Sequence, residues 1–362
     1  MNYVELLKSF MTTFAPSGYE KNMAYLFKSE MEKTADSVVL DRMGNVIAEY
    51  KGTDANAPVV MAFAHLDQLG FIVRKIEKDG YMQVDRLGGI PEKVLPGLNI
   101  CILTTDGSLV PGVIGNKSHH ASSAEDKYKV DLITSLFVDI GASNSEEVRN
   151  LGIEIGCPVT YMPYFQQLNN NYVSGTSIDN RGGLTALAVA GELLSKKRPI
   201  STTYIVGTVW EEFNLRGAML AARSIKPDIT ISLDVALTGD TKDLNNRYEV
   251  ACGDGPVLIL YSFHGRGTLN GTIPHEGLVK LVRKVAFEEG IPLQHFASQG
   301  ILTDSAYVQL EGKGTAAVEL GFPARYTHTP VEVANTDDIY RLGQLLAGII
   351  KNIDSNFNLN RY

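Results

Sequence analysis

Metal-binding and acid–base side chains follow three apolar segments of the sequence, each at a point where a strand is expected to end. His65 and Asp67 follow VVMAFA, the adjacent pair Glu211 and Glu212 follows YIVGTVW, and Asp234 follows DITISL. In open α/β sheets, ligands bind at the carboxyl ends of the strands. We therefore expect these side chains to converge on one crevice.

Two further residues extend this set of candidate ligands. Asp179 lies in SGTSIDNRGG directly before an expected helix, and His328 lies in PARYTHTP on a loop after an expected strand. Two imidazoles and at least three carboxylates offer the mixed nitrogen and oxygen ligands that suit zinc, cobalt or manganese. Taken singly, Asp179 could equally cap the helix, and either histidine could be an ordinary structural residue. Metal binding is favoured because these residues share matching ends of successive sheet elements, and because carboxylates clustered without cations raise one another's pKa.

The adjacent glutamates have a chemical explanation in a two-metal hydrolase. One carboxylate must bind a metal ion, while a neighbour must accept a proton from the water that attacks the substrate. Adjacent residues at a strand end can direct one side chain to the metal and the other to the water. We therefore assign Glu212 as a metal ligand and Glu211 as the general base.

The elements that would position these residues alternate along the chain. Helix and strand patterns alternate through RGGLTALAVAGELL, TTYIVGTVW, LRGAMLAARSI and DITISLD, then through PHEGLVKLVRKVAFEEG and KGTAAVEL, with a last helix from Asn335. The nearly continuous apolar run PVVMAFAHLD is typical of a strand buried on both faces of a largely parallel sheet. The pattern predicts an α/β fold in which a mixed, largely parallel sheet lies between helices.

A central segment has a different texture. Residues 71–168 contain short alternating segments separated by turn signals such as KDG, TTDGS and LGG, with one short helical piece in SNSEEVRNLG. Such a pattern is typical of a small β-rich domain. We expect it to be inserted into a discontinuous catalytic domain formed by residues 1–70 and 169–362.

The N-terminal region carries two local signals. Ser17 and Glu20 in SGYEKNMAYLFKSEM form the pattern of a capping box, so we expect both to be structural residues at the start of a helix. The sequence Met43-Gly44-Asn45 predicts a hairpin turn before the first buried strand.

The composition restricts the partners and the location. Among 362 residues, 44% are hydrophobic and the formal net charge is −8, which argues against nucleic acid or an anionic membrane as a partner. No apolar run approaches the roughly 20 residues that cross a bilayer. The N-terminus has no pattern of an export signal, so we expect a cytoplasmic protein. Three scattered cysteines, Cys101, Cys157 and Cys252, fit neither a disulfide framework nor a structural zinc cluster.

Five ordered motifs resemble those of one family. AHLDQLGF, SIDNRGG, TVWEEFNLRGA, SLDVALTGD and PARYTHTPVE are similar to motifs of the dinuclear-metal aminopeptidases, a family of the co-catalytic metallopeptidase clan. This family includes glutamyl aminopeptidases, deblocking aminopeptidases and the large tetrahedral aminopeptidase complexes. The resemblance extends from PSGYE near the start to HTPVE near the end, and LFVDIGA and GILTDSA also match.

The resemblance implies two divalent metal ions per subunit, with zinc or cobalt expected first and manganese as a further option. Asp179 would bridge both ions, His65 and Asp234 would complete one site, and Glu212 and His328 would complete the other. It also implies that the inserted domain is a small β-barrel of PDZ-like shape. That domain would mediate dimerisation and the assembly of a tetrahedral, twelve-subunit shell.

Further implications concern the neighbours of the ligands. Asp67 would orient His65 through the free ring nitrogen of the imidazole. Gln68 stands where the family usually has Glu, which removes a charge near the metals and leaves the preferred substrate side chain open. Asn180 replaces the second Asp of the usual DDR, and the peptide bond between Asp179 and Asn180 is expected to be cis.

We predict a metal-dependent aminopeptidase that removes N-terminal residues from short peptides with a free N-terminus. Glu211 would take the proton of the attacking water and later give it to the leaving amine. Two alternatives stay open: a deacylase or carboxypeptidase of the same clan, and a noncatalytic peptide-binding assembly module. Polysaccharide hydrolysis is disfavoured because a glycosidase needs two free carboxyls beside the sugar.

Overall fold

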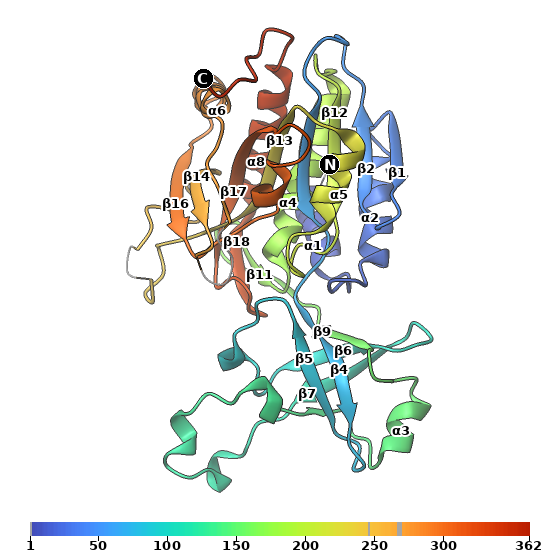
Figure 1. Ribbon diagram of the computed structural model, residues 1–362. Coiled ribbons are helices and arrows are strands. Elements are labelled where there is room, and N and C mark those ends of the chain that lie inside the picture. Colours follow the sequence, from blue (N-terminus) through green and yellow to red (C-terminus); the bar gives the residue numbers. More distant parts are fainter. Residues whose placement is uncertain (1, 245–246, 266–269) are drawn as a thin grey trace.

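The computed structural model describes residues 2–244, 247–265 and 270–362. In this part of the chain, the structure has a mixed sheet of 12 strands and a smaller closed barrel. The barrel extends from one end of the domain that contains the large sheet (Figure 1). The predicted α/β class with a mixed sheet is confirmed. The PDZ-like shape of the barrel stays a prediction.

Parallel strands form the centre of the large sheet, where the candidate ligands were expected. The order there is β12-β3-β13-β17, and each neighbouring pair is parallel. His65, the last residue of β3, lies opposite Thr208, the last residue of β12. The carboxyl ends of these strands therefore meet at one edge. The four strands are β3 (Val60–His65), β12 (Thr203–Thr208), β13 (Ile229–Leu237) and β17 (Ala316–Arg325).

Antiparallel strands flank this centre on both sides. On one side, β2 pairs with β12, and β1 pairs with β2 across the predicted hairpin. On the other side, the strands after β17 are β18, β11 and β10, in that order. Strands β14, β15 and β16 attach through the pair of β14 with β17. Their bounds are β1 Ser37–Leu40, β2 Val46–Tyr50, β10 Phe165–Gln167, β11 Tyr172–Gly175, β14 Val257–Phe263, β15 Gly271–Thr272, β16 Gln294–Gln299 and β18 Glu332–Asn335.

Helices cover both faces of the sheet because its central strands are apolar on both faces. Along β3, Val60, Ala62 and Ala64 pack into the larger core with α1, α2, α4, α6 and α8, whereas Met61 and Phe63 pack with α5 and α7. Of the helices described, none has both the length and the apolar character needed to cross a membrane. Their bounds are α1 Tyr3–Met11, α2 Lys21–Met31, α4 Ile178–Lys196, α5 Gly217–Ile225, α6 Glu276–Glu288, α7 Ser305–Val308 and α8 Thr336–Lys351.

The barrel is formed by six consecutive strands that close on themselves in the order β4-β5-β8-β7-β6-β9. It has its own apolar core, which includes Phe71, Val84, Ile102 and Val159. The strand that follows, β10, already pairs with β11 of the large sheet. The bounds are β4 Gly70–Ile76, β5 Met82–Leu87, β6 Asn99–Leu103, β7 Leu109–Ile114, β8 Val138–Asp139 and β9 Pro158–Tyr161, with helix α3 at Ser145–Asn150.

Three local predictions have different outcomes. Asp234 does not follow its strand, because β13 continues to Leu237. The capping box is wrong: α2 begins at Lys21 without a side-chain cap, and the Ser17 and Glu20 side chains bind elsewhere. The peptide bond between Asp179 and Asn180 is cis, as predicted.

Candidate metal centre

The first group of candidate ligands joins two strands and one helix. His65 ends β3, Asp234 lies within β13, and Asp179 lies in the first turn of α4; one ligand atom of each falls within 4.8 Å of the others. The closest pair is His65 Nε2 and Asp179 Oδ1, at 3.2 Å. All three side chains are buried. The sequence prediction that these residues converge on one crevice matches this geometry.

A second group shares Asp179 with the first. It consists of Asp179, Glu212 and His328, again with ligand atoms within 4.8 Å of one another. His328 Nε2 lies 3.7 Å from Asp179 Oδ2 and 3.8 Å from Glu212 Oε1. The two carboxylate oxygens of Asp179 therefore face different histidines.

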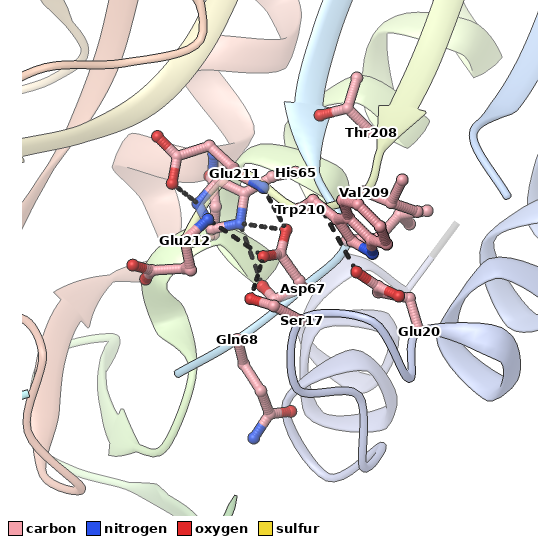
Figure 2. Close-up of polar contacts among 12 residues, drawn as sticks. Ser17, Glu20, His65, Asp67, Gln68, Thr208, Val209, Trp210, Glu211 and Glu212 are labelled. Carbon is pink, nitrogen blue, oxygen red and sulfur yellow. Dashed lines mark hydrogen bonds and ion pairs between the residues drawn. The ribbon is translucent and has the colours of Figure 1, made fainter. Parts of the chain in front are cut away.

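Asp67 connects both glutamates to His65. Its Oδ1 accepts a hydrogen bond from the Glu211 amide and its Oδ2 accepts one from the Glu212 amide, each at 3.0 Å (Figure 2). The Nδ1 atom of His65 lies 3.0 Å from the main-chain oxygen of Asp67 and 3.5 Å from its Oδ1. One buried carboxylate thus fixes the backbone of the glutamate pair beside the imidazole.

The glutamate pair does not directly follow its strand. β12 ends at Thr208, and Val209 and Trp210 separate it from Glu211. Glu211 Oε2 lies 3.9 Å from His65 Nε2, while Glu212 approaches His328. Both glutamates therefore lie near His65, since ligand atoms of His65, Glu211 and Glu212 fall within 4.8 Å of one another, and Glu212 also approaches His328. The roles of base and ligand stay a prediction.

Glu332 is a buried residue of the site that sequence reasoning missed. Its Oε1 accepts a hydrogen bond from the His328 amide at 2.8 Å, and its Oε2 accepts one from the Asp179 amide at 3.0 Å. His328 Nδ1 in turn lies 2.7 Å from the Gly89 carbonyl oxygen, on the barrel side. The sequence signal for this residue was its place at the end of the motif HTPVE. Its partner Asp179 is distant in sequence, so no local pattern showed the contact.

The electrostatics of the site fit bound cations. Burial raises the pKa of Glu211 and of Asp234 well above the ordinary carboxyl range, and it raises the pKa of Glu212 to about 7. Carboxylates packed this closely need positive charge from protons or from bound metal ions. The donors are imidazole nitrogens and carboxylate oxygens, and this set suits zinc, cobalt or manganese.

Comparison with known proteins decides the family. The model of the M42 glutamyl aminopeptidase family matches residues 44–345. SgcX of Escherichia coli (strain K12), which is named as an aminopeptidase, is 37% identical over 348 residues, covering 95% of this chain and 93% of SgcX. The chain belongs to the M42 family. This M42 peptidase is thus a hydrolase that acts on peptides, as predicted, and members of its family are metallopeptidases.

Two solved structures of aminopeptidases share nearly the whole fold of this M42 peptidase. Aminopeptidase APDkam598 from Desulfurococcus kamchatkensis superimposes with a TM-score of 0.92 at 31% identity, covering 98% of this chain and 96% of the other. The TET1 peptidase of Pyrococcus horikoshii, described as assembling into a tetrahedron or a large octahedral shell, gives 0.85 at 26% identity, covering 97% and 100%.

A cavity of about 720 Å³ opens over both ligand groups of the M42 peptidase. The barrel contributes part of its wall through residues 86 and 88–92, of which Arg86 and Glu92 form an ion pair at 3.5 Å. The large sheet and its loops supply apolar residues to the same cavity. These residues are Leu215, Val235, Leu237, Ile301 and Leu302.

Gln68 does not face this cavity. Its Oε1 accepts hydrogen bonds from the Ala15 amide at 3.2 Å and from Arg181 Nη2 at 3.0 Å, and its Nε2 donates to Thr160 Oγ1 at 2.8 Å. In Figure 2 the Gln68 side chain points away from the glutamate pair. The departure from the usual Glu therefore changes the buried scaffold behind the site rather than the surface that meets substrate.

Proposed function

We propose that this M42 peptidase is a two-metal aminopeptidase that removes residues one at a time from the free N-terminus of short peptides. The observation that carries the proposal is the position of Asp179, whose two carboxylate oxygens belong to two different ligand groups. His65 and Asp234 would complete one metal site, and Glu212 and His328 the other. Zinc or cobalt is expected first, with manganese as a third option.

The ions, when bound, would supply Lewis-acid polarisation of the first peptide carbonyl and lower the pKa of a water molecule. Glu211 is the residue of this chain that we assign to proton transfer: it takes a proton from the attacking water and donates it to the leaving amine. The burial of Glu211 supports this role. A carboxyl group shielded from bulk water does not lose the accepted proton to solvent before the leaving amine takes it.

Asp67 and Glu332 hold the reacting groups in place. Asp67 binds the amides of both glutamates and orients His65, and Glu332 binds the amides of Asp179 and His328. Each carboxylate is buried and accepts two backbone hydrogen bonds in the site. Such outer hydrogen bonds fix the direction of metal ligands and commonly change metal affinity or activity by about 10- to 100-fold when removed.

Recognition of a free amino terminus is supported by the relatives of this chain. APDkam598, an aminopeptidase, resembles it over nearly its whole length. We therefore favour an aminopeptidase over the deacylase and the carboxypeptidase of the same clan.

Self-association completes the proposal. We assign residues 1–70 and 169–362 to the catalytic domain and residues 71–168 to the domain that mediates dimerisation and assembly into a dodecamer. The similarity to the P. horikoshii TET1 peptidase, which forms closed shells, supports assembly. So do large apolar side chains exposed on the barrel domain: Leu109, Val113, Tyr128, Val130, Leu132 and Phe137.

Matched peptide series test this function. Peptides with acidic, basic or apolar first residues, each free and N-acetylated, would be incubated with metal-stripped protein refilled with zinc, cobalt or manganese. We expect metal-dependent release of the first residue from the free series. Cleavage of the acetylated series would favour the deacylase, and cleavage of neither series would favour the noncatalytic module.

A further inference from the structure

The backbone that carries the two catalytic glutamates is held by side chains rather than by a neighbouring strand. After β12 ends, the amide of Val209 donates to Asn45 Oδ1 at 2.9 Å, and the amide of Trp210 donates to Glu20 Oε1 at 3.2 Å. The next two amides, of Glu211 and Glu212, bind Asp67. Four successive amides therefore depend on three side chains from other parts of the chain.

Two of these anchors are tied to the N-terminal segment 16–20, which we call the PSGYE turn. The Ser17 hydroxyl donates to Asp67 Oδ2 at 2.6 Å, and Glu20 Oε1 also accepts a bond from the Gly18 amide at 2.9 Å (Figure 2). The amide of Tyr19 closes the turn on the Pro16 carbonyl oxygen at 2.8 Å. Gly18 has a φ of +87°, which the turn requires and a side chain would resist.

The turn lies against the glutamate segment in a buried environment. Ser17, Glu20 and Asp67 are each less than a tenth exposed. The fully buried guanidinium of Arg181 binds the Leu66 carbonyl oxygen and Gln68, and its charge interacts with both Asp67 and Glu20. Hydrogen bonds in a buried environment of low dielectric are stronger than in water, so these contacts fix geometry effectively.

The backbone of Trp210 needs such support. Its φ is +61°, a left-handed conformation that is unfavourable for a bulky side chain and persists where surrounding contacts impose it. This conformation reverses the chain directly before Glu211. The contact that meets the Trp210 amide is Glu20 of the PSGYE turn.

We infer that the PSGYE turn is a positioning element for the general base: Ser17 and Glu20 hold the segment 210–212 so that Glu211 is aimed at the reacting water. This inference rests on the proposed role of Glu211. Ser17 acts through Asp67, and Glu20 acts through the Trp210 amide. The pair that resembled a helix cap in the sequence thus supports the chemistry, although neither residue lines the cavity.

Ser17→Ala and Glu20→Ala remove the two contacts. The conservative variants Ser17→Thr and Glu20→Gln keep a side-chain oxygen at each position. Glu32→Gln, on an exposed glutamate at the end of α2, is the matched control. Kinetics would be measured on the metal-loaded full-length protein, with metal content per chain determined in parallel. A displacement of about 1 Å at a reacting group can lower a rate by about 100-fold. We therefore expect both alanine variants to lose about 10- to 100-fold in kcat with little change in KM and with metal content retained.

A second readout does not depend on activity or on metal. Trp210 is the one tryptophan of the sequence, so its fluorescence reports on this segment alone. In metal-stripped protein, we expect Ser17→Ala and Glu20→Ala to shift the emission to longer wavelength and to increase quenching by acrylamide. Ser17→Thr, Glu20→Gln and the control should resemble the unmodified protein in both readouts.

The outcomes separate this inference from the proposed function. If the unmodified protein is active and Glu211→Gln is inactive, but both alanine variants keep kcat within about twofold, the positioning role is wrong and the function stands. Loss of metal in proportion to loss of kcat would also overturn it, because the turn would then hold the ligands rather than the base. If Glu211→Gln keeps full activity, the assignment of the base itself fails, whatever the turn variants do.

Discussion

Glu211 and Glu212 are adjacent in the sequence, share one anchor and both lie near His65, and Glu212 also approaches His328. Asp67 binds both amides, after which Glu211 turns toward His65 and Glu212 toward His328. Because the backbone is fixed equally for both, a substitution that keeps the shape of either side chain should affect chemistry or metal binding separately.

Glu211→Gln should abolish turnover and keep the metals. General acid–base catalysis contributes about 100- to 10,000-fold, so we expect kcat to fall by that factor, because the amide cannot take the proton. Metal content measured by mass spectrometry should match that of the unmodified protein. The companion variant Glu212→Gln should lose metal instead; the reverse pattern would mean that the two roles are exchanged.

Asp179→Ala should empty both metal sites together, because its two oxygens face both ligand groups. Metal binding would be followed by titration calorimetry on stripped protein. Asp234→Ala is the matched comparison, since Asp234 belongs to the first group alone and should weaken one site more than the other. Two tight sites remaining in the Asp179 variant would contradict the bridging assignment.

At the scale of the elements, β3, β13 and the segment after β12 bring the candidate ligands together, because the parallel strands run to one edge of the sheet. A candidate ligand need not stand at a strand end, because Asp234 lies within β13. Helix α4 delivers Asp179 from its first turn, and the turn before β18 delivers His328, whose amide is fixed by Glu332.

The cap of the last helix gives a test at this scale. Asn335 Oδ1 accepts a hydrogen bond from the Asp337 amide at 2.9 Å, as expected for a helix that begins after Asn335. Asn335→Ala should lower the free energy of unfolding by about 1 kcal/mol, measured by urea denaturation followed by circular dichroism. Asn335→Ser keeps an acceptor and should retain most of the stability. Equal stability of the two variants would show that the cap contributes nothing.

At the scale of the molecule, the barrel is both a wall of the active-site cavity and a carrier of exposed apolar side chains. Residues 86 and 88–92 reach the cavity, and Gly89 binds the ring of His328. The irregular segment after β7 exposes several large apolar side chains close together in sequence, among them Tyr128 by 90% and Leu132 by 65%. We therefore propose that assembly and substrate access involve the same domain.

Leu132→Asp should weaken self-association, because it places a charge in the proposed contact. Light scattering after size-exclusion chromatography would measure the mass of the particles, and we expect a shift from dodecamers to dimers or monomers. Leu310→Asp is the matched control, since Leu310 is 67% exposed and lies outside the barrel domain. Identical masses for the Leu132 variant and the unmodified protein would exclude this segment from the interface.

The sequence by itself determined the elements and the residue types of the site. Long apolar runs such as that of β3 predict buried central strands, because burial on both faces leaves no polar position in the pattern. It also selected Asp179 and His328 as candidate ligands among many polar residues, from their places beside an expected helix and an expected strand, and the structure places them in one group with Glu212. Short strands such as β15 and β18 were beyond it, because segments of two and four residues are too short to show an alternating pattern.

Only the tertiary structure decided what the polar residues bind. Ser17 and Glu20 follow the spacing of a helix cap, but their side chains bind Asp67 and Trp210, which arrive from distant segments. Gln68 lies three residues after His65 and points into the scaffold, because residues an odd number apart in an extended chain face opposite ways and Arg181 binds it there. A local pattern specifies local hydrogen bonds; the pairing of buried charges depends on the packing of the whole fold.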